Sequence, residues 1–314
     1  MLDSIWKDIK KEFSYGNMVT RIIFVNIGFF ISVYLVKLIL RGFYGNEPAF
    51  HTAFEQFSNF FSLSGNILFD LTHPWVFFTH MFLHFGFFHI LWNMLFLYWF
   101  GRIVGDFIGN QRVLPLYLLG GLAGAIAYVV FANLAYGGQG FAYGASGAVN
   151  AIVVAAAVIS PDYNMRLLFF GDVKLKFIAA IVVLLSIMGI ADLTNTGGNV
   201  AHLGGALFGW FFILKLREGN DLSIPVNRVL DRIMRFFKKV PEMAKSQPKR
   251  GPRMAYKSAN KERSRSRGRG SAISDEHNLS HQEKIDAILD KIKKTGYDSL
   301  SSEEKKFLFN ASKK

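Results

Sequence analysis

One serine and one histidine stand near the start of two separate apolar segments of membrane-spanning length. Ser146 lies in the sequence Gly-Ala-Ser-Gly-Ala, ahead of an apolar run that ends near Pro161. His202 lies in Ala-His-Leu-Gly-Gly, ahead of a run that ends at Lys215. A serine becomes a strong nucleophile when a neighbouring base takes its proton. Ionisable groups are rare in membrane segments, so this pair indicates a nucleophile and its base.

The arithmetic of helix length places these groups at one depth. A helix rises about 1.5 Å per residue, so Ser146 lies roughly 22 Å before Pro161. His202, and His89 of a third apolar segment, each lie roughly 20 Å before the basic residue that follows their own segment. Because the hydrocarbon layer is about 30 Å thick, all three side chains are expected beneath the same membrane surface.

Composition places most of the chain in a membrane. Hydrophobic residues make up 51% of the sequence and aromatic residues 15%, and the mean hydropathy is positive. These values exclude a disordered chain or an ordinary soluble protein for most of the length. The pattern predicts an all-α polytopic membrane protein with six transmembrane helices. The expected spans are residues 18–41, 83–101, 113–135, 145–159, 174–193 and 199–216.

The basic residues indicate how the spans are oriented. No Lys or Arg occurs in residues 42–101, 113–165 or 177–214, which contain the three loops on the side opposite the termini. Lys and Arg favour the cytoplasmic loops of membrane proteins. We therefore expect an integral multi-pass protein of a bacterial cytoplasmic (inner) membrane with both termini in the cytoplasm. The serine and the two histidines would then open toward the non-cytoplasmic face.

The net charge of +13 belongs almost entirely to the tail. The first 214 residues hold only 11 of the 36 Lys and Arg residues and 10 of the 23 acidic residues. The basic remainder follows directly after the last expected span, next to a leaflet that is usually anionic. We therefore expect the tail to contact membrane lipids rather than nucleic acid.

Composition also divides the chain into four parts. They are a short cytoplasmic segment, a six-span domain, a basic juxtamembrane segment with a flexible linker, and a small helical module, at residues 1–17, 18–217, 218–275 and 276–314. The stretch 43–82 is too long for a plain connector, and its aromatic residues predict a structured loop. A basic helix is expected over residues 218–245.

The C-terminal module is expected to be a helical hairpin. Two Ser-x-x-Glu sequences, which begin at Ser280 and Ser301, have the pattern of a capping box, and apolar residues follow each of them. Gly296 lies where the first helix would end. The hairpin, residues 280–312, is too short to hold a large core, so we expect it to dock an unidentified partner.

Ser146 and His202 each have a structural interpretation as well. Small residues are common where membrane helices touch, and a membrane histidine can be a hydrogen-bonded structural group. The Gly-x-Ser-x-Gly pattern of soluble hydrolases is not met, because alanine replaces its last glycine. A Gly-x-x-x-Gly spacing after His202, however, allows a neighbouring helix to approach closely, and the pairing is the stronger interpretation. The glycines that would permit close approach to the site are Gly144, Gly147, Gly205 and Gly209.

The third apolar segment carries His84, His89 and Asn93. His89 and Asn93 are four residues apart and share one face of a helix. Their N–H groups could donate to the oxyanion of a tetrahedral intermediate. Metal binding is the alternative, because His80 and His84 have the same spacing, but no carboxylate accompanies them as in His-Glu-x-x-His. We therefore expect neither a metal nor another cofactor.

These motifs together resemble those of the rhomboid intramembrane serine proteases. The similarity rests on three patterns in the expected order: His-x-x-x-x-His-x-x-x-Asn, Gly-Ala-Ser-Gly-Ala and Ala-His-x-x-Gly-x-x-x-Gly. It covers residues 18–216 and implies a rhomboid-like six-helix bundle. It also implies a catalytic dyad of Ser146 and His202 without an acidic third member.

The same resemblance implies the rest of the site. The oxyanion hole would consist of the Ser146 backbone N–H, His89 and Asn93, with His84 as a supporting residue. The fifth span and the loop of residues 194–199 would gate the lateral entry of the substrate.

The chain departs from the family pattern in three places. The first outer loop contains no Arg, and the acidic residue after the second span is Asp106 rather than residue 105. Relatives often place an aromatic residue against the catalytic histidine four positions after the serine, where this chain has Asn150. Only this third departure lies in the site.

The sequence therefore predicts an intramembrane serine endopeptidase that cleaves transmembrane segments of membrane proteins near the non-cytoplasmic face. A rhomboid-like protein that binds membrane helices without cleaving them is one alternative, and the dyad argues against it. A transporter is another, which the uncharged spans and the absence of paired halves disfavour. The expected partners are transmembrane protein substrates and membrane lipids.

Overall fold

The computed structural model describes residues 16–45, 47–167 and 171–243, together with Ile288, Lys291, Ser301, Glu303, Glu304 and Phe307. The chain divides into two compact units, Met1–Ser246 and Gln247–Lys314. The expected N-terminal segment 1–17, apart from its last two residues, lies outside the described residues. The expected linker up to residue 275 and most of the expected hairpin 280–312 lie outside them as well.

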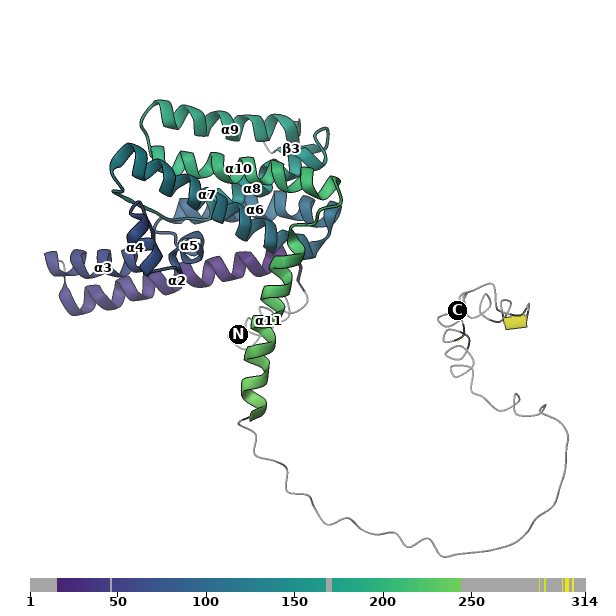
Figure 1. Cartoon of the computed structure of the whole chain (residues 1–314), viewed down its shortest axis with the longest axis horizontal. Helices are drawn as coiled ribbons and strands as arrows, with labels where there is room; N and C mark the ends of the chain where they lie inside the picture. Colours follow the sequence, from purple (N-terminus) through teal and green to yellow (C-terminus); the bar gives the residue numbers. More distant parts are fainter. Residues whose placement is uncertain are drawn as a thin grey trace, which may run out of the picture. The chain divides into compact units, whose positions relative to one another are not determined.

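Apolar helices build the first unit. In chain order they are α2 (Met18–Tyr44), α6 (Phe87–Ile108), α7 (Val113–Tyr136), α8 (Ser146–Ile159), α9 (Leu175–Ala191) and α10 (Thr196–Arg217). Four of them, α2, α6, α7 and α10, are long and apolar enough to cross a membrane, and α8 and α9 are shorter apolar helices. They run side by side in one bundle (Figure 1), so the expected all-α membrane class is confirmed.

Two expected boundaries are wrong. The second span was expected from residue 83, but α6 begins at Phe87, because Gly86 is an extended N-cap that follows a short 3-10 helix, η1 (His80–Phe82). His84 therefore precedes the helix that carries His89. The expected loop 194–199 is also too long, because α10 already begins at Thr196. Hydropathy marks where a chain is apolar, whereas capping geometry decides where the helix starts.

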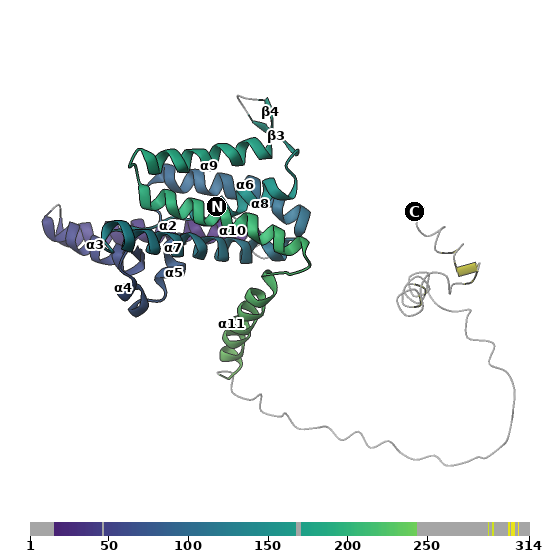
Figure 2. The same cartoon turned by 45° about the horizontal axis from the view of Figure 1, so that its top comes forward.

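Helix α8 lies at the centre of the bundle and is too short to span it. It packs against α6, α7, α9 and α10, and most of its residues are buried. Figure 2 shows α9 on the outside of this group. The 14 residues of α8 extend roughly 21 Å, against a hydrocarbon layer of about 30 Å. Helix α8 is therefore shorter than the apolar layer of a membrane.

The stretch 43–82 is structured, as expected. It contains α3 (Pro48–Phe61), β1 (Leu63–Ser64), α4 (Ile67–Thr72), α5 (Val76–Thr79) and η1. Strand β1 pairs antiparallel with β2 (Phe141–Ala142), and Leu63 lies opposite Ala142. Asp70 of α4 accepts a hydrogen bond from Ser64 N at 2.9 Å, and burial raises the pKa of its carboxyl to about 6. The loop is thereby joined to the segment that leads into Ser146.

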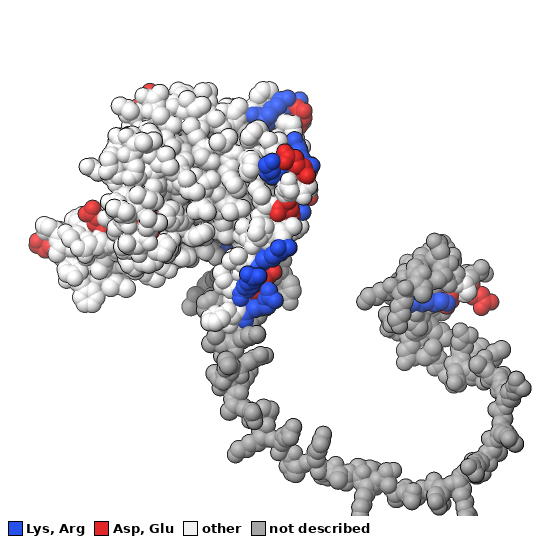
Figure 3. All heavy atoms as spheres, in the orientation of Figure 1, with Lys and Arg blue, Asp and Glu red and all other residues white. Residues whose placement is uncertain are grey.

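The other end of the bundle carries most of the basic residues. Most of the Lys and Arg side chains that are visible on the first unit in Figure 3 gather there. Two short antiparallel strands, β3 (Asn164–Leu167) and β4 (Gly171–Lys174), connect α8 to α9 at this end and were not expected from the sequence. The 3-10 helix η2 (Asn110–Arg112) connects α6 to α7, and α11 (Ser223–Met243) follows α10, inside the stretch where a basic helix is expected.

The second unit shows one of the two expected capping boxes. Ser301 N donates to Glu304 Oε2 at 2.7 Å, and Glu304 N donates to Ser301 Oγ at 3.3 Å. This reciprocal pair is the hydrogen-bonding pattern of a capping box. Lys291 Nζ lies 2.8 Å from Glu304 Oε1 and joins this turn to an earlier helical position.

Candidate active site

The side chains of Ser146 and His202 meet inside the bundle. Ser146 is the first residue of α8, and His202 lies in the first half of α10. His202 Nε2 and Ser146 Oγ are 2.7 Å apart, which is hydrogen-bonding distance. When the imidazole proton is on Nδ1, Oγ donates to Nε2, and this is the arrangement in which a histidine removes the proton of a serine. The structure therefore brings together the two residues that the sequence motifs indicate.

This short distance depends on the close approach of α10 to α8. A Cβ atom on Gly205 would overlap the backbone carbonyl of Gly147, and one on Gly209 would overlap the carbonyl of Ala151. Helix α7 approaches α10 in the same way through Gly124, where an added Cβ would lie 2.7 Å from a backbone oxygen of α10. Only hydrogen fits at these positions, because real Cβ atoms do not come that close to a carbonyl oxygen.

The segment before α6, which includes His80 and His84, makes hydrogen bonds with the turn that precedes Ser146. Gly144 N donates to the carbonyl of His80 at 2.8 Å, and Ala145 N donates to His84 Nε2 at 3.3 Å. The His84 side chain is fully buried, and its Nδ1 lies 3.3 Å from the carbonyl of Phe82. A proton on Nδ1 leaves Nε2 free to accept from Ala145. His84 thus contacts the turn next to the serine and not the serine itself.

A polar network inside the bundle fixes the position of η1, the 3-10 helix that carries His80. Asn26 of α2 donates through Nδ2 to the hydroxyl of Tyr117 in α7, at 3.2 Å. The Tyr117 hydroxyl donates to the carbonyl of Met81, also at 3.2 Å. Buried polar groups with partners of this kind specify one arrangement of the elements that they join. The network therefore sets the position of η1 relative to α2 and α7.

His89 and Asn93 lie on the face of α6 that is turned toward the dyad. The His89 ring packs against Gly144, where a Cβ atom would come within 2.8 Å of Nε2. Gly144 has φ +116°, a conformation that favours glycine in any case. Asn93 Nδ2 donates to the carbonyl of His89 at 2.8 Å, which uses one of its two amide hydrogens.

Two cavities meet at the dyad, and Ser146, His202 and His89 line both of them. The first has a volume of about 490 Å³ and lies among α6, α8 and α9. Its walls are mainly apolar and include Phe88, Trp92, Phe96, Val182 and Leu185. The second, of about 640 Å³, lies among the loops at the end of the bundle near β2. Its lining is more polar and includes Tyr128, Gln139, Tyr143, Asn195 and Thr196.

Asn150 and Ser186 also line the first cavity. Asn150 Nδ2 donates to the carbonyl of Ser146 at 2.8 Å, and its buried Oδ1 has no hydrogen-bond partner among the described residues. The sequence pointed to Asn150 only as a departure from a family pattern, although a spacing of four places it on the serine's side of the helix. Ser186 was missed, because a single serine in an apolar helix carries no signal of its own.

Comparison with known protein families divides the chain in a similar way. Residues 71–219 match the family described as Rhomboid domain. Residues 275–314 match a family of unknown function, DUF6576. The first match contains the dyad, His84, His89 and Asn93.

Individual relatives are similar over part of their length. The chain is 32% identical over 154 residues to RHOMBOID-like protein 12, mitochondrial, of Arabidopsis thaliana, which is 45% of this chain and 46% of that protein. It is 30% identical over 139 residues to the presenilin-associated rhomboid-like protein, mitochondrial, of Homo sapiens, 42% of this chain and 35% of that protein. The matched region thus spans less than half of each relative. Their mitochondrial names do not support the expected bacterial cytoplasmic membrane.

The contact between α8 and α10 can be tested by adding one methyl group. Gly205→Ala is expected to lower the thermal unfolding midpoint of the detergent-solubilised protein, because the methyl group overlaps the Gly147 carbonyl. Overpacking of this kind costs typically about 1–3 kcal/mol, which exceeds the gain in helix propensity of about 1 kcal/mol.

Gly28→Ala is the matched control. Gly28 lies in α2, another apolar helix, and an added Cβ there meets nothing within 4 Å. This variant should unfold at the same temperature as the unchanged protein or at a higher one. Equal midpoints for the two variants would show that α8 and α10 do not touch as described.

Proposed function

We propose that this chain, which belongs to the rhomboid family, is an intramembrane serine endopeptidase that cleaves transmembrane segments of membrane proteins. The observation that carries the proposal is the distance of 2.7 Å between Ser146 Oγ and His202 Nε2. A serine and a histidine at this distance, beside a cavity large enough for a peptide side chain, form a nucleophile and base that can act on a carbonyl. A protein that only binds membrane helices would not need this pair.

In the proposed mechanism His202 takes the proton of Ser146 while Oγ attacks the carbonyl carbon of the scissile peptide bond. The same imidazolium then donates that proton to the leaving nitrogen, so that the bond breaks and an acyl-enzyme remains. A water molecule, deprotonated by His202, attacks the ester carbonyl. The proton returns to Oγ, the second product leaves and the dyad is restored.

The oxyanion of each tetrahedral intermediate requires hydrogen-bond donors next to Ser146. The serine is the first residue of α8, and the first N–H groups of a helix have no acceptor within the helix. The positive end of the helix dipole also favours a negative charge there. We assign His89 and the second amide hydrogen of Asn93 as further donors, because both residues line the cavity that contains the Ser146 hydroxyl.

The two cavities support separate routes for substrate and water. The first is lined by apolar side chains of α6 and α9, so an apolar substrate segment can enter it from the lipid without exposing hydrocarbon to water. Its backbone must unwind locally, because a helical carbonyl is already hydrogen-bonded. The second cavity, with tyrosine, glutamine and asparagine in its lining, supplies the hydrolytic water.

We further propose that α8 and α9 complete a set of six spans. Ser146 would then lie below the face opposite the basic end, and cleavage would occur near that face. The gathering of Lys and Arg at one end supports a cytoplasmic assignment for that end, with Lys37 and Arg41 of α2 as the exceptions. Both termini would then be cytoplasmic.

This orientation assigns a different function to each part of the chain. We place catalysis in residues 18–217 and lipid contact in the basic segment 218–275. The helical module of residues 276–314, which nearly coincides with the match to the family of unknown function, would dock a partner that is not yet identified.

Ser146→Ala is expected to abolish reaction of the full-length protein with a fluorophosphonate probe and cleavage of a transmembrane model substrate. Oγ is the attacking atom, and no other group replaces it. Ser186→Ala is the matched control, because Ser186 lines the same cavity but donates its hydroxyl to the Val182 carbonyl. The control should keep both reactions. Labelling of the Ser146→Ala variant would exclude this residue as the nucleophile.

His89→Ala is expected to lower kcat for the model substrate by about a hundred- to a thousand-fold, the usual loss for one oxyanion donor. KM should change little, because the donor acts on a charge that forms only in the transition state. Circular dichroism and the unfolding midpoint serve as checks that the variant is folded. A folded variant with unchanged kcat would remove His89 from the oxyanion hole.

The orientation can be tested with single cysteines, since the chain contains none of its own. Tyr136→Cys, at the end of α7 near the serine, should react in intact cells with a thiol reagent that does not cross membranes. Asp172→Cys, in β4 at the basic end, should react only after permeabilisation. Labelling of residue 172 alone in intact cells would reverse the orientation and the face on which products are released.

A further inference from the structure

Helix α11 has two chemically distinct faces. Apolar residues recur at helical spacing on one face, and charged residues occupy the other. The apolar face includes Val226, Val229, Leu230 and Ile233, and the charged face includes Arg228, Asp231, Arg232 and Arg235. Val229 and Ile233 expose 52% and 48% of their surface, so the rest of the described first unit leaves this face largely uncovered. A basic amphipathic helix of this kind is typical of the membrane interface.

The direction of α11 is that of an interfacial helix. In both Figure 1 and Figure 2 it runs across the direction of the bundle helices, starting from the end where α10 finishes. In Figure 3 its Lys and Arg side chains face away from the uncharged body of the bundle, and its uncharged side faces the opposite way. The apolar face is thus turned toward the layer that the apolar spans occupy.

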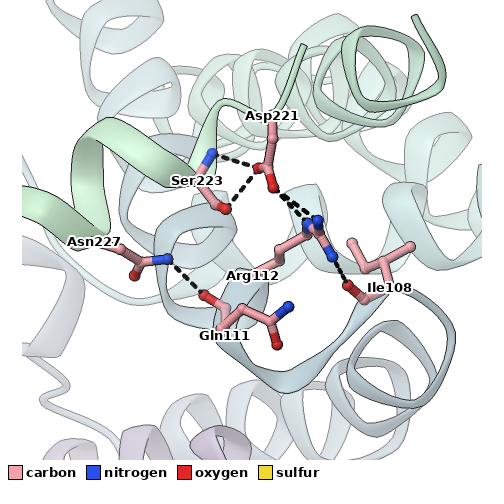
Figure 4. Close-up of polar contacts among 6 residues, drawn as sticks. All are labelled: Ile108, Gln111, Arg112, Asp221, Ser223 and Asn227. Atoms are coloured by element: carbon pink, nitrogen blue, oxygen red, sulfur yellow. Dashed lines mark hydrogen bonds and ion pairs between the residues drawn. The ribbon is translucent and has the colours of Figure 1, made fainter. Parts of the chain in front are cut away.

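A polar cluster fixes the start of α11 to the turn between α6 and α7 (Figure 4). Asp221 accepts hydrogen bonds from Ser223 N at 2.9 Å and Ser223 Oγ at 2.6 Å, and its Oδ2 lies 2.8 Å from Arg112 Nη2. Asn227 Nδ2, one turn further, donates to the carbonyl of Gln111 at 3.2 Å. Arg112 also donates to the carbonyl of Ile108.

This cluster is partly buried and remains charged. Burial by itself would raise the pKa of Asp221, but the hydrogen bonds from Ser223 and the Arg112 guanidinium outweigh it and lower that pKa. Because the cluster involves both the first residue of α11 and Asn227 in its second turn, it sets the direction of the helix as well as its starting point.

We propose that α11 lies in the membrane interface at the basic end of the bundle and binds anionic lipid headgroups. Its apolar face, with Val229 and Ile233, enters the boundary between headgroups and acyl chains. Arg228, Arg232 and Arg235 on the charged face attract the headgroup phosphates and carboxylates. Three observations favour lipid as the occupant: the helix starts where the spans end, runs across them, and carries complementary charge. The inference rests on, and makes specific, the lipid contact proposed above for residues 218–275, and it does not depend on whether the dyad is catalytic.

The test uses the full-length protein with a nitroxide attached to one introduced cysteine, at Ile233 or at Arg232. These neighbouring positions are about 100° apart around α11, the first on its apolar face and the second on its charged face. The labelled proteins are reconstituted in vesicles of phosphatidylcholine, alone or mixed with phosphatidylglycerol. Power saturation then measures collisions with oxygen, which concentrates in the bilayer, and with a water-soluble nickel chelate. A label at Leu207, a residue of the apolar helix α10 that is 65% exposed, gives the reference value for a position in lipid. A label at Asp172 gives the reference value for a position in water.

We expect the label at residue 233 to collide mainly with oxygen, as at residue 207, and the label at residue 232 mainly with nickel. The contrast should grow when phosphatidylglycerol is present. Equal access of nickel to both positions in both vesicles would overturn the proposal, since α11 would then lie in water. Protection of residue 233 from both reagents would overturn it as well, because a second copy or another part of the chain would then cover the apolar face.

The contribution of charge is tested separately. Replacing Arg228, Arg232 and Arg235 together by glutamine, with the label at residue 233, should remove most of the difference between the two lipid mixtures. The apolar face is unchanged in this variant, so failure to fold is not expected. An undiminished response to phosphatidylglycerol would show that these arginines do not recognise the headgroups.

Discussion

The contact between α8 and α10 is the constraint on which the rest of the site depends. Side chains normally keep two helix axes 8–10 Å apart, and a hydroxyl and an imidazole on such helices need not meet. Here Gly205 and Gly209 remove the side chains that would separate the backbones, and the carbonyls of Gly147 and Ala151 occupy the space. Ser146 and His202 lie just beyond this contact, toward the same end of the bundle, and reach 2.7 Å.

A second constraint is the length of α8. Its 14 residues extend roughly 21 Å, less than a hydrocarbon layer of about 30 Å, and the residues that follow Ser146 at its start are buried in the protein. The backbone groups at that end need partners, because lipid offers none. The carbonyl of His80 and the Nε2 of His84 meet this need for Gly144 and Ala145. The start of α8 is thus held by protein on one side and faces a cavity on the other.

The loop of residues 43–82 completes this arrangement. Its strand β1 pairs with β2, directly before the turn that leads to Ser146, and η1 carries His80 at its other end. The loop therefore contacts the serine turn through two separate segments. Movement of the loop would disturb the turn, which explains why a connector of this length is folded rather than free.

The sequence by itself indicated the candidate site residues and most of the helices. Apolar runs located all six helices, and the spacing of Gly205 and Gly209 identified the face of α10 that approaches a neighbour. The types of Ser146, His202, His89 and Asn93 restricted the reactions to be considered. Each of these inferences rests on a local pattern, because residues on one helix keep a fixed spacing whatever surrounds them.

Only the tertiary structure decided which elements meet. The sequence did not reveal that His84 leaves the helix of His89 and contacts the N–H of Ala145, that Ser186 shares a cavity with the dyad, or that Asp221 pairs with Arg112. Each of these contacts joins residues from different elements. Such contacts depend on how whole helices pack, and the packing is set by the summed fit of many side chains, which no single stretch of sequence contains.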